Sequence, residues 1–470
     1  MSRRTRIMLI QPLTPEILEK RRNFRRKILG VPVRVWRKTR RFAFWSLAIG
    51  FVLHSALNIY ASTLLNQELS AIRQKGEPLQ FSELAPPAVP DSQNAALVYK
   101  AAFDSILFSD EQKGSFRTRE SNWSAQQGRW IEAAVAKNQK AIGLARRAAA
   151  MPKCVFPLAY NTKNSSGLLF PHYLEMRELA RLLSAQAQVE AQKGDIDRAL
   201  RDVRAVLAMA NHLSNEPVLI GFLVAQAVDG IAYQALARIL QTTQISLAQA
   251  ETFKKSLPPT DWNRAFKRCL TGERVWSIDA FELVRRTRKG NFLADLGVDS
   301  APFWASYPLT LLWRPVSKLD QVQTLRLWKQ HFVSASAPAF SPQALFNDQI
   351  LEDAPKYAIL TRLWMPVFSR ASINRDRAEV RSLQREIALA LAVYRGQNGA
   401  YPARLEQLKP ALPFDPYNKK PMVYRREKNG FLLYSVGPNR EDESGGNAQF
   451  QLPSGSWTAS DDIVWGAPKR

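Results

Sequence analysis

The side chains in this chain that could do chemistry are few and scattered. His172 and Glu175 are three positions apart, so a helix would place them on one face, where they could bind a metal ion or transfer a proton. Glu178 and Asp229 are further acids of the same region, and with Glu175 they are candidate residues of a hydrolase. A helix that begins after Pro171 with ordinary polar residues explains the same pattern, and a lone acid is more often paired or exposed than catalytic.

The sequence lacks the motifs of the common catalytic sites. Its four histidines form no His-Glu-x-x-His pair, and there is no Gly-x-Ser-x-Gly elbow, no phosphate-binding glycine loop and no dinucleotide fingerprint. We therefore predict no catalytic residues and favour a non-enzymatic protein. The alternative is a membrane-tethered hydrolase with a cleft in its helical region.

Positive charge gathers near the N-terminus and is followed by an uncharged apolar stretch. The chain has 470 residues and a net charge of +25, and Lys and Arg are dense in residues 1–41. Residues 42–65 contain no charged side chain and match the ~20 residues that a helix needs to cross the hydrocarbon core. The basic flank favours a cytoplasmic N-terminus and is too long for an ordinary cleaved signal. We expect a single-pass anchor in a bacterial cytoplasmic (inner) membrane, with the bulk of the chain outside.

The basic arm can be interpreted in two ways. Cations beside a membrane attract anionic lipid by about 1 kcal/mol each, which makes anionic membrane lipid the expected partner of the arm. Nucleic-acid binding is the alternative, but the arm has few interleaved aromatic residues, Phe24 and Trp36 among them, and no nucleic-acid-binding module. We therefore predict no nucleic-acid partner.

The remaining chain reads as mainly α-helical. The hydrophobic content of 46% is ordinary for a folded protein. Proline-rich composition predicts a semi-rigid spacer after the membrane helix. The predicted segments are a basic cytoplasmic arm (1–41), a transmembrane helix (42–65), a Pro-rich linker (66–93), a helical exterior domain (94–370) and a small α+β domain with an antiparallel sheet (371–470).

Two stretches of the helical domain carry the clearest patterns. Residues 179–213 form two amphipathic helices split at Gly194, and their small residues resemble one tetratricopeptide unit, although a generic helical hairpin explains them as well. Residues 217–240 are apolar enough to suggest a second membrane span. Because Asp229 near its middle would be costly in lipid, we predict a buried helix of the exterior domain instead.

Cys154 and Cys269 are the only cysteines in the sequence. An oxidising exterior would permit a disulfide between them. Neither has a neighbour at metal-binding spacing, and buried free thiols fit the sequence equally well.

The last hundred residues carry the most fold information. A long amphipathic helix over residues 374–397 is followed by Asn398-Gly399, which suits its termination. Residues 422–427 and 431–436 predict two strands joined by a tight turn at Asn429-Gly430. The predicted order is therefore helix, turns and β-hairpin.

This tail resembles the globular domain of the major pseudopilins of type II secretion systems. The resemblance rests on Tyr394, Asn398, Gly399, Tyr401, Pro402, Leu405, Leu408, Asp415, Pro416, Pro421, Tyr424, Leu433, Tyr434, Ser435 and Gly437. It covers about a fifth of the chain. The whole arrangement also looks like uncharacterised membrane-anchored proteins of planctomycete-type bacteria.

The chain departs from the pseudopilin pattern at the filament-forming part. No leader with a processing glycine precedes the membrane helix, which lies far upstream of the tail, so assembly as an ordinary filament subunit is not expected. The resemblance implies a calcium site, and the matching positions are Asp442, Asp461 and Asp462, although a solvated acidic loop accounts for them equally well. The expected role is that of an envelope protein with an envelope protein partner, acting near secretion or pilus-like machinery.

Overall fold

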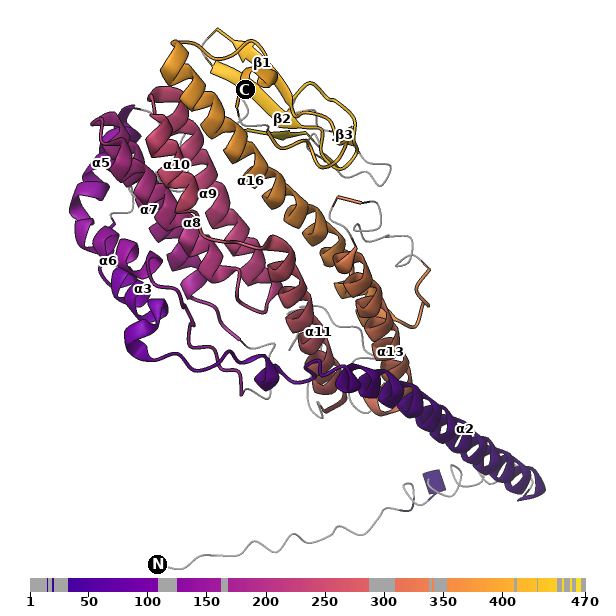
Figure 1. Ribbon diagram of the computed structural model, residues 1–470. Coiled ribbons are helices and arrows are strands. Elements are labelled where there is room, and N and C mark those ends of the chain that lie inside the picture. Colours follow the sequence, from indigo (N-terminus) through magenta and orange to yellow (C-terminus); the bar gives the residue numbers. More distant parts are fainter. Residues whose placement is uncertain are drawn as a thin grey trace, which may run out of the picture. The chain divides into compact units, whose positions relative to one another are not determined.

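The computed structural model describes residues 15, 19–20, 33–108, 125–161, 168–286, 309–337, 340–341, 353–409, 412–428, 430–445, 450–451, 457–458 and 462–465. The chain divides into two compact units, residues 1–63 and residues 64–470. The described residues are mainly helical, with a small antiparallel sheet near the C-terminus, as the sequence predicts (Figure 1).

Helix α2 (Val33–Gln74) carries the predicted membrane span. Its apolar side chains face outward: Phe42, Leu47 and Phe51 are 75%, 76% and 73% exposed. Helix α9 (Leu219–Thr242) is the other helix in the described part of the chain that is long and apolar enough to cross a membrane, but 67% of its apolar window is buried in the protein. The prediction that residues 217–240 form a buried helix is confirmed.

The segment predicted as a free proline-rich spacer is packed against the helical body. Helix α2 continues to Gln74, and short 3-10 turns follow at η1 (Phe81–Leu84) and η2 (Asp91–Gln93). Phe81 is 2% exposed, and Glu77 forms an ion pair with Arg274. The prolines shape this connection, but burial of the apolar residues between them ties it to the body.

The helical body is built from eleven described helices. They are α3 (Ala95–Phe103), α5 (Ala125–Lys137), α6 (Gln139–Ala149), α7 (His172–Gln192), α8 (Ile196–Leu213), α9, α10 (Leu247–Lys255), α11 (Trp262–Arg286), α13 (Leu309–Ser336), α15 (Ile359–Trp364) and α16 (Pro366–Asn398). Alanine-rich faces of α7, α8 and α9 pack closely, with Ala187, Ala199 and Ala232 fully buried. Gly194 takes the left-handed conformation (φ +85°) between α7 and α8, and Asp195 caps α8, which confirms the predicted hairpin.

Two helix beginnings are capped by side chains from other helices. The backbone N–H of Leu219, at the start of α9, donates to Glu273 of α11 at 2.8 Å. Asp320 of α13 accepts from the N–H groups of Leu360 and Thr361 at the start of α15, at 2.9 and 3.2 Å. Carboxylates suit these positions because the first N–H groups of a helix lack partners within the helix.

The tail begins with α16, which ends at Gly399 in the left-handed conformation (φ +76°). After the 3-10 turn η7 (Leu405–Gln407), strands β1 (Val423–Glu427), β2 (Gly430–Ser435) and β5 (Ile463–Val464) form an antiparallel sheet in the order β1-β2-β5. Strands β3 (Phe450–Gln451) and β4 (Trp457–Thr458) form a separate pair. The predicted hairpin is confirmed, with Val423 opposite Tyr434.

The tail is docked on the helical body. Helix α16 packs along α9 and also contacts β2 and β5 (Figure 1). The Gln384 side chain of α16 donates to the Ile463 carbonyl, and the Tyr233 ring of α9 meets Trp465 edge-on with ring centres 4.4 Å apart. Helix α16 is thus part of the tail and also packs as one of the helices of the body.

Candidate functional site

His172 lies at the start of α7 and contacts an acid that the sequence pattern does not indicate. Its Nε2 is 2.8 Å from Oε1 of Glu216, on the loop after α8. The Tyr173 hydroxyl donates to the other oxygen of the same carboxylate. Phe156 stacks on the imidazole, with ring centres 4.1 Å apart. Acid, imidazole and phenol therefore form one connected group.

Close helix packing holds this group in place. A Cβ atom on Gly221 of α9 would lie 2.7 Å from the Tyr173 hydroxyl, so glycine leaves the room that the tyrosine occupies. Burial, followed by the nearby Glu216 charge, raises the pKa of Tyr173 far above its ordinary value and raises that of Tyr160 to about 12. Both phenols therefore stay protonated, and Tyr173 donates its proton to the hydrogen bond with Glu216.

The group has the components of an acid–base pair. A carboxylate that contacts an imidazole orients the ring, which is the arrangement used by many general bases. The side chains of His172 and Glu216 are 7% and 11% exposed. Both side chains are thus largely shielded from solvent.

Glu175 is not the partner of His172, contrary to what the spacing suggests. Glu175 is half-buried, and burial followed by the charge of Asp104 raises the pKa of its carboxyl group, while His172 acts in the opposite direction. Glu178 is half-buried on the same helix. The i,i+3 spacing makes Glu175 and His172 neighbours, but the hydrogen bond goes to a residue from another part of the chain.

Asp229 is a buried acid within the contact between α9 and α16. It is 4% exposed, and its Oδ1 is 3.8 Å from Nη1 of Arg385. Burial raises the pKa of Asp229, and the charges of Arg385 and Arg381 oppose that effect. Gly230 leaves space for Arg381, whose Nη1 would be 3.5 Å from a Cβ atom there. Asp229 therefore links two helices and lies on a different interface from His172.

The acids expected to bind calcium meet at the loop after β2. Asp442 accepts from the Tyr434 hydroxyl at 2.7 Å and from the Ser444 N–H at 2.8 Å. Asp462 accepts from the N–H groups of Glu443 and Gly445 at 3.1 and 2.8 Å, and burial raises its pKa to about 6.

The third expected ligand, Asp461, lies outside the described residues. Within the described part of the chain, no three His, Cys, Asp or Glu side chains gather as a metal site would require. The carboxylates of Asp442 and Asp462 both bond to the loop after β2, and they would supply some of the oxygen ligands that a hard cation needs. Calcium binding at Asp442, Asp461 and Asp462 therefore stays a prediction.

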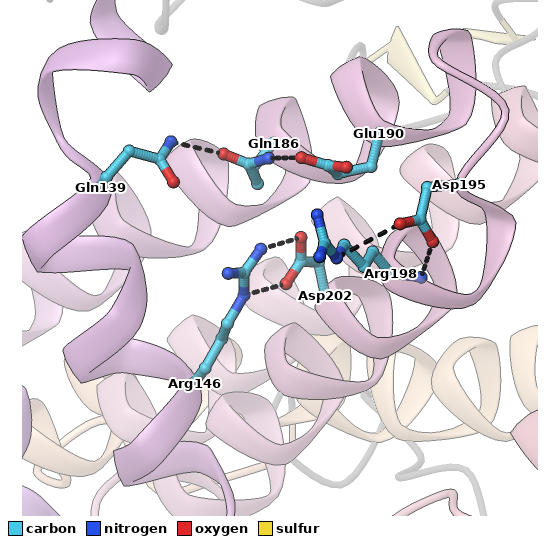
Figure 2. Close-up of polar contacts among 7 residues, drawn as sticks. All are labelled: Gln139, Arg146, Gln186, Glu190, Asp195, Arg198 and Asp202. Atoms are coloured by element: carbon cyan, nitrogen blue, oxygen red, sulfur yellow. Dashed lines mark hydrogen bonds and ion pairs between the residues drawn. The ribbon is translucent and has the colours of Figure 1, made fainter.

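A polar cluster joins α6, α7 and α8, and sequence reasoning missed it (Figure 2). Arg146 donates to both oxygens of Asp202 at 2.6 and 2.8 Å, and the Asp202 side chain is fully buried. A second chain of hydrogen bonds runs from the Gln139 amide to the Gln186 amide, which in turn donates to the Glu190 carboxylate. The only sequence signal is a few polar residues on otherwise apolar helix faces.

The two cysteines are free thiols. Cys269 is buried and donates to the Phe266 carbonyl, while Cys154 is half-buried. Burial raises the pKa of each thiol above its ordinary value, so neither is a ready nucleophile. The sequence allows either a disulfide between Cys154 and Cys269 or two free thiols, and the structure has two free thiols.

Fold and side chains together define a mainly helical protein with an apolar N-terminal helix and a small antiparallel sheet. No protein-family model, no curated protein and no solved structure matches this chain. The likeness of residues 371–470 to pseudopilins therefore rests on the motifs quoted above.

Proposed function

We propose that this protein is a single-pass envelope protein of a bacterial cytoplasmic membrane. Its N-terminus is cytoplasmic, and its helical body and pseudopilin-like head are extracytoplasmic. It acts without catalysis, as an interaction protein that binds an envelope partner near secretion or pilus-like machinery. The basic arm binds anionic lipid on the cytoplasmic side.

The outward-facing apolar surface of α2 carries this proposal. Large side chains such as Phe42, Leu47 and Phe51 are exposed on α2, and residues 42–65 contain no charge. Water would disfavour this surface, whereas hydrocarbon accepts it without cost. A lipid bilayer is the environment that satisfies both observations.

The interior of the body supports an interaction role over a catalytic one. Asp229 and Asp202, two of its buried acids, contact arginines from neighbouring helices. Such pairs link neighbouring helices and place each buried acid beside an opposite charge. A rigid body of this kind suits the display of a surface to a partner.

Extraction of membranes with alkaline carbonate tests the anchor. We expect the full chain to remain in the membrane pellet. A variant with Leu47→Arg and Phe51→Arg should appear in the supernatant, because each arginine at mid-span costs about 3 kcal/mol on insertion scales. Leu247→Arg, at an exposed leucine of α10, is the matched control and should stay in the pellet. Release of the unaltered chain by carbonate would refute the proposal.

The contact between His172 and Glu216 favours a second candidate, a membrane-tethered hydrolase. In that case Glu216 orients His172, and the imidazole takes a proton from water or from a substrate hydroxyl. The test is hydrolysis of ester, amide and glycoside substrates by the full chain in detergent. Activity that is lost in Glu216→Gln and kept in Glu175→Gln would support the hydrolase, and no activity above the double variant His172→Gln/Glu216→Gln would reject it.

A further inference from the structure

The end of the α11–α13 helix pair forms a basic surface. The two helices run antiparallel: Trp328 of α13 donates from Nε1 to the Ser277 hydroxyl of α11 at 3.0 Å, and Arg314 donates from Nη2 to the Arg285 carbonyl at 3.3 Å. The last turn of α11 and the first turns of α13 therefore lie at the same end of the pair.

Two contacts, one with the last turns of α2 and one with the segment after it, show which end this is. Arg326 of α13 bonds to Glu68 at 2.9 Å. Further along, Arg274 pairs with Glu77 and lies 5.0 Å from the centre of the Phe332 ring. Helix α13 therefore runs in the same direction as the chain from Glu68 to Glu77. Both lead away from residue 64, where the second unit begins.

The basic end therefore points toward residue 64. Arg314 precedes Arg326 by 12 positions along α13, which at 1.5 Å per residue corresponds to ~18 Å toward the entry of the chain. Glu68 follows the predicted membrane span by only a few residues. The first turns of α13 are thus at the end of the second unit that faces its first residue, Leu64.

The charge of this end is strongly positive. The charges of Arg285 and Arg314 lower the pKa of Lys318, after burial, which contributes most. Burial also lowers the pKa of Arg285 to about 10; the charge of Glu282, which pairs with Arg286, opposes that effect, and the charges of Arg286 and Arg314 add to it. These cations are close enough to repel one another, and they would gain from a shared anion.

Exposed apolar side chains accompany the cations. Leu312 is 66% exposed and is two positions from Arg314. Leu363 of α15 is 52% exposed, and the next residue, Trp364, contacts Phe281 of α11. Cations beside exposed leucines and a tryptophan are typical of surfaces that lie in a membrane interface.

We propose that Arg285, Arg314, Lys318 and Leu312 form a second membrane contact, which binds anionic lipid headgroups on the extracytoplasmic side. This inference rests on the proposed membrane anchor. The contact would hold the body against the bilayer and fix its orientation, which a single membrane helix cannot do alone. It is distinct from the basic arm, which lies on the other side of the membrane in the proposed topology.

A fluorescent label at Leu312 tests the proposal. The full chain carries Leu312→Cys labelled with bimane in a Cys154→Ser background, since Cys269 is buried, and is placed in nanodiscs. The discs contain either phosphatidylcholine alone or an equal mixture with phosphatidylglycerol, and quenching by aqueous iodide is measured. A label at Leu247→Cys on α10 is the control position.

Protection of the Leu312 label from iodide only in the discs with phosphatidylglycerol is the expected result. Arg285→Gln, Arg314→Gln and Lys318→Gln should each weaken the docked state by about fivefold, the effect of one cation near an anionic surface. Lys193→Gln, Lys255→Gln and Lys409→Gln, at exposed lysines elsewhere, should leave the protection unchanged.

Equal quenching in both kinds of disc, or full protection in the triple variant of Arg285, Arg314 and Lys318, would overturn the second contact. In that outcome a chain that still enters the discs leaves the membrane anchor intact. A chain that does not enter the discs would refute the anchor and this inference together.

Discussion

Gly272 of α11 lies directly against Pro217, at the entry to α9. A Cβ atom on Gly272 would be 1.5 Å from the Pro217 carbonyl oxygen, which no relaxation of a side chain can relieve. The approach brings Glu273 to the N–H of Leu219, where it caps α9. A single glycine thus permits the contact and the cap together.

Replacement of Gly272 by alanine should therefore separate α11 from α9. We expect Gly272→Ala to lower the free energy of unfolding by about 3 kcal/mol or more, since overpacking and loss of the cap act together. Gly143→Ala is the control, because Gly143 is exposed on α6 with no atom within 4 Å of its Cβ position. It should stabilise by about 1 kcal/mol. Equal stability of the two variants in thermal unfolding would contradict the contact.

The pair Arg146–Asp202 predicts an asymmetric response. Arg146 is 39% exposed and can turn to water, whereas Asp202 is fully buried and cannot. Arg146→Met should therefore cost roughly 3 kcal/mol, because it leaves a buried carboxylate without its partner. Adding Asp202→Asn should recover part of that loss. Arg198→Met, at a more exposed pair with Asp195, should change stability by less than about 1 kcal/mol.

Denaturant titration of these three variants in detergent would measure the difference. If Arg146→Met and Arg198→Met were equally stable, the pair Arg146–Asp202 in Figure 2 would not contribute to the packing of α6 on α8.

His212 predicts a loss of stability in acid. Its Nε2 is 2.9 Å from the Met151 carbonyl, so that nitrogen carries the proton and Nδ1 accepts from the Tyr99 hydroxyl at 3.1 Å. Burial lowers the pKa of His212 to about 4 from an ordinary value of 6.5, against a smaller effect of the Met151 hydrogen bond. The unfolded chain therefore binds the proton more readily, and stability is present above pH 6.5 and falls as the pH drops toward 4.

The size of this effect follows from the shift in pKa. Between neutral pH and the acid limit, His212 should account for roughly 3 to 4 kcal/mol of the loss in unfolding free energy. His212→Asn should remove that part of the pH dependence. Tyr99→Phe should lower stability at all pH values but retain the slope, because the imidazole still titrates. An unchanged slope in His212→Asn would show that the imidazole is not buried in its neutral form.

The loop after β2 predicts a response to calcium. Binding of calcium by the folded chain alone stabilises it by about 2.7 kcal/mol at a hundred times the dissociation constant, which should raise the melting temperature. Asp442→Asn and Asp462→Asn should each reduce the rise. Glu406→Gln, at an exposed acid elsewhere in the tail, should not. A melting temperature that is the same with calcium and with chelator would reject the site.

Sequence patterns predicted the elements whose signals are local. The apolar period of residues 217–240 with Asp229, the break at Gly194 and the hairpin near Gly430 each depend on neighbouring residues, and the structure has each of them. Helix boundaries were less accurate. Helix α16 begins at Pro366 and not at the predicted residue 374, and proline is tolerated at this first helical position because the N–H that it lacks would have no partner within the helix.

The polar contacts could not be predicted because they join distant parts of the chain. His172 meets Glu216 and not Glu175, since the turn after α8 returns the chain to the start of α7. Arg146 and Asp202 are 56 positions apart. Their pairing depends on how α6 packs on α8, and no spacing in the sequence records that packing.

The side of the membrane on which the body lies is the most direct test of the proposed function. Single cysteines at Lys20 in the arm and at Leu247 in the body, in a Cys154→Ser background, would be exposed to a membrane-impermeant thiol reagent in bacterial spheroplasts. The proposal predicts labelling at position 247 in intact spheroplasts and at position 20 only after permeabilisation. Labelling at position 20 in intact spheroplasts, or at position 247 only after permeabilisation, would contradict it.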